Sequence, residues 1–227
     1  MCDAMARREA VTGRKMLRPG KPGGKGSGME VNVLLFPDFE TLDAFGPVEI
    51  LGRSGEYLLN YVSVDGGMVR SRQGAEIATR ALEAVSKTGI LLVPGGIGTR
   101  PLVHDSGFLA RLGEAARNAE YCLTVCTGSA LLAKTGLLDG RRATSNKRAM
   151  DWVVSVNPAV NWVHRARWVV DGKFYTSSGV SAGMDMALGF LADRLGREAA
   201  EEAALGAEYL WNRDRDNDPF ACDAQQL

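Results

Sequence analysis

Residues 121–130 read YCLTVCTGSA, and this stretch decides the fold. A short run of β-favouring residues ends at Cys126, and the small residues that follow open a segment of helical composition that ends at Gly136. A cysteine in such a position is either a small apolar residue of the core or a nucleophile mounted on a sharp turn. In either case the pattern predicts a strand that is followed directly by a helix.

Strands and helices alternate on both sides of this turn. Apolar runs predict buried strands over 30–36, 57–64 and 89–96, as is typical of parallel sheets covered on both faces. Helical patterns cover 41–53, 105–119 and 181–196, and Asp171-Gly172 marks a hairpin turn. We therefore expect an α/β sandwich around a mainly parallel sheet, with the reactive groups at the carboxyl ends of its strands.

The 227 residues include 27 basic and 27 acidic side chains, but the charge is unevenly distributed. Residues 1–28 hold 7 Lys or Arg against 2 Asp or Glu and end in a run rich in Gly and Lys. We expect a basic, flexible extension over 1–28 and a single domain over 29–227. A net charge of zero gives no general attraction to nucleic acid, and no apolar run is long enough for a membrane span. The expected partner is a small-molecule substrate.

Four cysteines are too few for a disulfide framework in a chain of this length; they are Cys2, Cys122, Cys126 and Cys222. The spacing of Cys122 and Cys126 fits neither a C-x-x-C redox pair nor a zinc site. The sequence therefore predicts a reduced, cytoplasmic protein without a metal site.

Cys126 has the surroundings of a nucleophile. The first amides of the following helix, that of Thr127 above all, would favour a thiolate and could receive negative charge on a substrate. Gly128 is small enough to let the turn close. The PGGIG stretch at 94–98 ends a neighbouring strand, so Gly96 and Ile97 are candidates for a second amide donor. The alternative readings are a buried structural cysteine and a plain tight turn.

Asp43 is the candidate acid. It stands between Leu42 and Ala44 in FPDFETLDAFGP, just past the end of a strand. A carboxyl group in apolar surroundings tends to keep its proton near neutral pH and can act as a general acid. The competing reading is an acid in the first turn of a helix. Neither His104, which precedes a helix, nor His164, expected within a strand, is placed beside the turn at Cys126, so a Cys-His-acid triad is poorly supported.

Residues 30–215 resemble the ThiJ/PfpI superfamily, in its isocyanide-hydratase-like branch. The resemblance is carried by LLFPDFETLDAFGP, LLVPGGIGTRPL, LTVCTGSALLAKTGLLDGRRATS and VVDGKFYTSSGVSAGMDMAL. It implies a flavodoxin-like sandwich that commonly dimerises, with Cys126 as nucleophile, Asp43 as its carboxyl partner and Thr127 beside it. It also implies water addition to an isocyanide to give an N-substituted formamide, with no cofactor.

One departure from the family pattern falls after RAT. Many relatives continue with a histidine and a tryptophan where this chain has Asn146 and Lys147. The missing histidine counts against glutamine hydrolysis, and the wall of the pocket must differ from that of the hydratase branch.

Two other functions stay open at this point. The superfamily also includes glyoxalase or deglycase enzymes that act on small aldehydes, although that branch usually carries Glu where this chain has Asp43. Related domains also form the ligand-binding parts of transcription regulators, so the chain could be a sensor in which Cys126 is oxidised.

Overall fold

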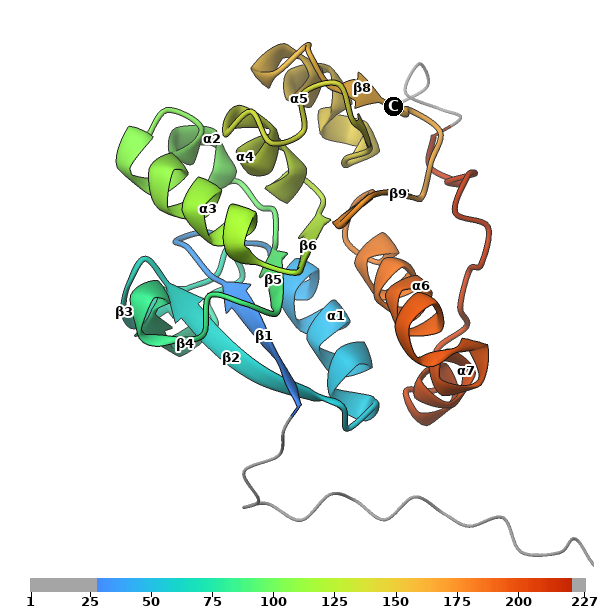
Figure 1. Cartoon of the computed structure of the whole chain (residues 1–227). Helices are drawn as coiled ribbons and strands as arrows, with labels where there is room; N and C mark the ends of the chain where they lie inside the picture. The colour runs from blue at the N-terminus through green and yellow to red at the C-terminus, as the bar shows by residue number, and fades with distance from the viewer. Residues whose placement is uncertain (1–27, 222–227) are drawn as a thin grey trace, which may run out of the picture.

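The computed structural model describes residues 28–221, and its centre is an eight-stranded sheet in the order β3-β4-β2-β1-β5-β6-β10-β9 (Figure 1). These strands are β1 (Met29–Leu34), β2 (Tyr57–Ser63), β3 (Asp65–Arg70), β4 (Glu76–Ala81), β5 (Ile90–Val93), β6 (Tyr121–Val125), β9 (Trp168–Asp171) and β10 (Phe174–Ser177). A separate pair is formed by β7 (Arg142–Ala143) and β8 (Asn161–Trp162). The extension predicted over 1–28 lies, except for Gly28, outside the described residues.

The sheet is mainly parallel, as predicted. Six neighbouring strands, from β4 to β10, pair in parallel, and β3 and β9 add antiparallel edges. The central strand β5 is buried along its whole length, which explains its unbroken apolar run. Because the parallel strands point the same way, the loops after β1, β5 and β6 open at one edge of the sheet. This arrangement is a flavodoxin-like fold.

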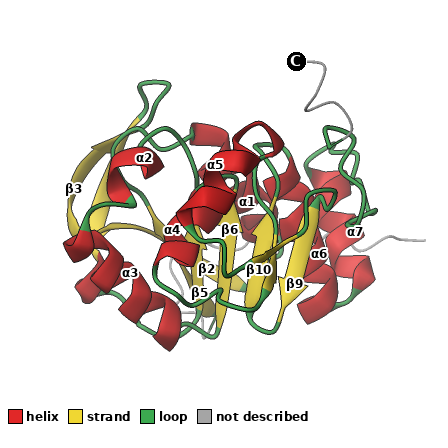
Figure 2. Cartoon of the chain, turned by 90° about the horizontal axis from the view of Figure 1, so that it is seen from above, coloured by secondary structure: helices red, strands yellow, loops and turns green. Residues whose placement is uncertain are grey.

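Helices cover both faces of the sheet (Figure 2). One face carries α1 (Thr41–Arg53), α6 (Ala182–Leu195) and α7 (Arg197–Gly206). The other carries α2 (Thr99–Leu102), α3 (Ser106–Asn118), α4 (Gly128–Lys134) and α5 (Met150–Val156). Two short 3₁₀ turns, η1 (Leu82–Ala84) and η2 (Lys147–Ala149), complete the elements. Within residues 28–221, no helix combines the length and the apolar character needed to cross a bilayer.

Local predictions are confirmed at two places and wrong at one. The helix predicted over 105–119 is α3, where the Asp105 side chain accepts a hydrogen bond from the Phe108 N–H at 2.9 Å. The hairpin at Asp171-Gly172 joins β9 to β10. His164 was expected within a strand and lies instead in a turn, because β8 ends at Trp162.

Candidate active site

Cys126 occupies the turn between β6 and α4, and its backbone is strained. Its φ of 56° lies in the left-handed region, which few residues other than glycine adopt. The Cys126 N–H donates to Ser178 O at 3.1 Å, and its carbonyl accepts from the hydroxyls of Ser129 (3.0 Å) and Ser145 (2.8 Å). Three bonds therefore hold a conformation that the residue would not keep by itself.

Two glycines let the neighbouring chain segments approach this turn. A Cβ on Gly128 would collide with the carbonyl oxygens of Val93 and Pro94 at the end of β5. A Cβ on Gly95 would stand 2.6 Å from the Thr127 nitrogen and 2.9 Å from Asp43 Oδ2. The turn therefore leaves no room for a side chain at Gly128, in agreement with the prediction that a small residue is needed there.

Asp43 lies in the first turn of α1, with no exposed surface. The Gly95 N–H donates to its Oδ2 at 3.0 Å, whereas Oδ1 is buried without a hydrogen-bond partner. The Cys126 thiol and the Val180 N–H act on the carboxylate more weakly than Gly95 does. Burial raises the pKa of Asp43 to about 7, and the negative charge of Glu40 adds to the effect. Asp43 can therefore both hold and release a proton near neutral pH.

The Cys126 thiol differs from the thiolate that the sequence predicts. Its side chain is 7% exposed, and burial raises its pKa far above the ordinary value. The negative charge of Asp43 raises this pKa further, and the opposing hydrogen bonds from Thr127 and Asn146 are too weak to compensate. The amides of the short helix α4 do not outweigh the loss of water. Near pH 7 the Cys126–Asp43 pair holds between one and two protons, so a thiolate requires that Asp43 carry the proton.

Thr127 connects the turn to the loop after β5. Its hydroxyl oxygen accepts from the Gly96 N–H and from the Thr99 hydroxyl, both at 3.1 Å. The Thr99 hydroxyl also lies 2.7 Å from Gly96 O. The Thr127 N–H bonds to the Cys126 sulfur, but the Gly96 N–H is taken up by Thr127. The Ile97 side chain is 51% exposed.

The residues that depart from the family pattern also lie at this edge of the sheet. The Asn146 side chain interacts with Cys126, and its Oδ1 accepts from the Arg148 N–H at 2.9 Å. Since Oδ1 is used in this way, the amide group of Asn146 is the part that can donate to sulfur. Lys147 Nζ bonds to Thr144 Oγ1 and Ala166 O, and burial lowers its pKa to about 8. Where many relatives have a histidine, which can accept a proton, this chain has Asn146, which can only form hydrogen bonds.

Sequence reasoning missed one cation at this site, Arg100 of α2. Its guanidinium stacks on the Trp152 ring, with 3.5 Å between the guanidinium carbon and the ring centre. Arg100 also interacts electrostatically with Cys126. Arg100 follows the PGGIG loop by two residues, but no local pattern marks it, because its contact with Trp152 joins two helices that are distant in the sequence.

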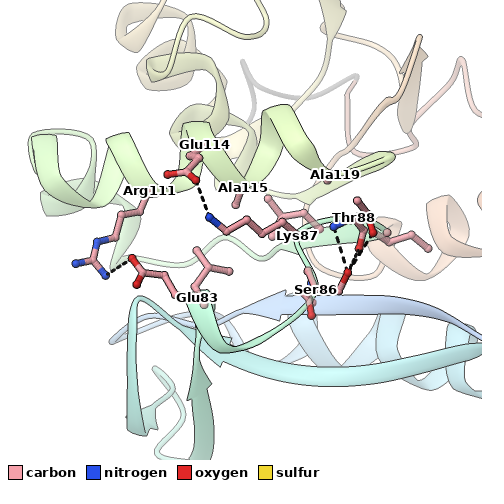
Figure 3. A pocket seen from close by; sticks show the side chains of 13 residues that line it. Glu83, Ser86, Lys87, Thr88, Arg111, Glu114, Ala115 and Ala119 are labelled. Carbon is pink, nitrogen blue, oxygen red and sulfur yellow. Dashed lines mark hydrogen bonds and ion pairs between the residues drawn. The ribbon is translucent and has the colours of Figure 1, made fainter. Parts of the chain in front are cut away.

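Two cavities differ in their relation to this site. One of about 300 Å³ adjoins the turn; its lining includes Asn146, Gly179 and Phe220. Its size suits a small organic molecule. The other, of about 40 Å³, lies at the amino end of β5 under α3, where Lys87 Nζ meets Glu114 at 2.8 Å (Figure 3). It is too small for a substrate.

Histidine does not take part in the site as the structure describes it. His104 precedes α3 and His164 lies in the turn after β8, and neither contributes to the surroundings of Cys126. Among residues 28–221 there is also no group of three or more His, Cys, Asp or Glu side chains arranged to hold a metal ion.

Comparison with known proteins gives consistent relatives. The DJ-1/PfpI family model matches residues 29–193. An isonitrile hydratase of Pseudomonas putida is 32% identical over 80% of this chain and 78% of its own length. The transcriptional regulator CdhR of Pseudomonas aeruginosa is 32% identical over 75% of this chain, which spans about half (52%) of the regulator. The crystal structure of a ThiJ/PfpI family protein from Pseudomonas syringae superimposes with a TM-score of 0.74 at 28% identity, covering 88% of this chain and 84% of that one.

Proposed function

The chain belongs to the DJ-1/PfpI family, and from this premise we propose that it is a cysteine-dependent hydratase acting on a small isocyanide. The observation that carries the proposal is the pairing of Asp43 with Cys126. Asp43 is fully buried, one of its carboxyl oxygens has no hydrogen-bond partner, and the Cys126 thiol lies beside it. Such a carboxyl group can move a proton at neutral pH. The product would be an N-substituted formamide.

The proposed reaction uses the shared proton of this pair. Asp43 accepts the thiol proton as Cys126 Sγ attacks the terminal carbon of the isocyanide, and the S–C bond forms. Asp43 then gives the proton to that carbon, which produces a thioimidate. Water adds its oxygen to the carbon and a proton to the nitrogen. The C–S bond breaks, the hydroxyl proton returns to the Cys126–Asp43 pair, and the formamide leaves.

The remaining candidates act as donors and spacers in this proposal. The Thr127 N–H supports negative charge on sulfur and on the adduct, and the Thr127 hydroxyl orders the Gly96 amide. Ile97 supplies the next amide, and Gly128 keeps α4 close to β5. Asn146 donates to sulfur where a histidine would compete for the proton.

The test is product formation from cyclohexyl isocyanide, followed by the appearance of N-cyclohexylformamide. Multiple turnovers are expected from the native protein, and Cys126→Ala should lower the rate by at least about 10³-fold, because the nucleophile is lost. Cys122→Ala is the matched control, since Cys122 lies four residues away in β6 and its sulfur bonds to Ala116 O at 3.5 Å. Equal activity of the native protein and Cys126→Ala would exclude the mechanism.

A sensor is the second candidate, favoured by the similarity to CdhR, a protein named as a regulator. In that case Cys126 would react once, with peroxide or an electrophile, and stop. Mass spectrometry separates the two, because an enzyme forms product in excess of protein while a sensor gains one adduct. Methylglyoxal in the same assay tests the glyoxalase alternative.

A further inference from the structure

Arg100 is a cation at the active-site edge that no acidic side chain neutralises. None of the ion pairs formed within residues 28–221 involves it, and it has no hydrogen bond from its guanidinium there. Its flat face is instead covered by the Trp152 ring at 3.5 Å. Stacking of this kind holds the guanidinium plane and leaves its edge, with paired N–H donors, free for a planar anion.

The backbone of Arg100 is tied to the turn at Cys126. Thr99, the preceding residue, bonds through its hydroxyl to Thr127 Oγ1 at 3.1 Å, and Thr127 follows Cys126 directly. The Arg100 N–H donates to Ile97 O at 3.0 Å. Helices α2 and α5, which carry Arg100 and Trp152, both pack against α4 (Figures 1 and 2). These contacts fix the backbone of Arg100 relative to the turn, and the Trp152 ring fixes the guanidinium.

The electrostatics agree with this position. Burial lowers the pKa of Arg100, and negative charge on Cys126 opposes the decrease, so the two groups lie within each other's field. An arginine keeps its charge under these conditions. The acid on the other side of the turn, Glu40, is already engaged, because its Oε1 accepts from Gln73 Nε2 at 2.7 Å. The guanidinium is thus available to a molecule that enters the site.

We propose that the electrophile attacked by Cys126 carries a carboxylate, which binds the free edge of Arg100 in a bidentate pair. The inference rests on the proposed function, since it names the substrate class of the same site: a small isocyanide with an anionic substituent. Binding of the carboxylate anchors the molecule at its inert end and holds the terminal carbon near sulfur.

The test compares two alkylating reagents that differ in charge, iodoacetate and iodoacetamide. The Cys126 sulfur attacks the CH₂ carbon of either reagent, so a C–S bond forms, the C–I bond breaks and iodide leaves into solution. Peptide mass spectrometry gives the rate of alkylation at this residue. Arg100→Gln should lower the ratio of the iodoacetate rate to the iodoacetamide rate at least tenfold. Arg117→Gln is the control, because Arg117 is an exposed cation in the last turn of α3, away from the turn at Cys126, and should leave the ratio unchanged.

Each other outcome overturns the proposal. If Arg100→Gln slows both reagents equally, Arg100 only stabilises the thiolate. If Arg117→Gln lowers the ratio as much, the selection comes from the general positive field. Arg100→Lys keeps the positive charge but lacks the paired donors of the guanidinium edge, so it should lower the ratio less than Arg100→Gln does. It serves as the test variant if Arg100→Gln does not fold.

A second comparison separates this inference from the proposed function. Isocyanoacetate and its methyl ester are matched substrates, and the anion should have the larger kcat/KM by tenfold or more in the native protein only. Turnover of both at equal kcat/KM would contradict the proposal that the substrate carries a carboxylate, but would agree with the hydratase function. Turnover of neither would overturn the hydratase, and the alkylation ratio would still decide whether the site selects a carboxylate.

Discussion

Asp43 and Asp185 are both fully buried, but their carboxylates have different hydrogen-bond and ion-pair partners. Asp185 of α6 accepts from Arg167 Nε at 2.6 Å, from the Tyr209 hydroxyl at 3.1 Å and from the Asn212 N–H at 2.9 Å. These donors come from segments before and after α6, so Asp185 holds the C-terminal part of the chain against the sheet. A buried charge paired in this way is a fixed part of the structure.

Asp43 receives one strong hydrogen bond, from Gly95, and no cation of residues 28–221 forms an ion pair with it. An unpartnered oxygen alone does not distinguish a reacting acid, since Asp218 Oδ2 also lacks a partner. Asp218, however, lies 3.5 Å from Arg167, which supplies the opposite charge. Burial raises the pKa of both Asp43 and Asp185, but Arg167 opposes the increase only at Asp185. The comparison teaches that a buried acid kept without a cation can exchange a proton near neutral pH, and that such an acid beside Cys126 can do chemistry.

The largest expected effect comes from Asp43→Asn. The variant cannot transfer a proton, so kcat/KM for isocyanide hydration should fall by about 10²–10⁴-fold. Its melting temperature should not decrease, because an amide replaces a carboxyl group that costs free energy to bury. Steady-state kinetics and thermal unfolding at pH 7 give the two values. Retained activity would show that the proton takes another route.

The opposite pattern is expected from Asp185→Asn. Removing this charge leaves the buried Arg167 guanidinium with only its longer, 3.5 Å contact to Asp218, and we expect a loss of about 3 kcal/mol in unfolding free energy. The kcat of the folded protein should change less than threefold, because Asp185 does not touch the turn at Cys126. Urea unfolding measures the first quantity. If this variant loses kcat and keeps its stability, the division between the two carboxylates is wrong.

The sequence predicts much of this molecule because the decisive features are local. A largely apolar run identifies β1 and an unbroken one identifies β5, and the strand–cysteine–small-residue pattern locates the turn at Cys126. The role of Arg100 is not visible in this way, because its approach to Trp152 results from the packing of two helices on α4. The sequence singles out Asp43 by its place after a strand end and by the family resemblance, but the apolar neighbours alone do not distinguish it from Asp185. Both stand among apolar residues, and only the folded chain brings Arg167 to one of them.

The protonation of Asp43 makes the stability of the folded protein depend on pH. In the unfolded chain its pKa is near the ordinary value of 3.8, and in the folded protein it is about 7. Between these values the folded state binds a proton that the unfolded state lacks, so the stability of the native protein decreases as the pH rises. Asp43→Asn has no such proton. Its unfolding free energy relative to the native protein should therefore rise by about 1.4 kcal/mol per pH unit from pH 4 to pH 7 and stay level outside that window. Urea unfolding of both proteins at half-unit steps of pH measures this difference. A flat difference across the window would show that the folded protein does not raise the pKa of Asp43, which would contradict its part in moving a proton near neutral pH.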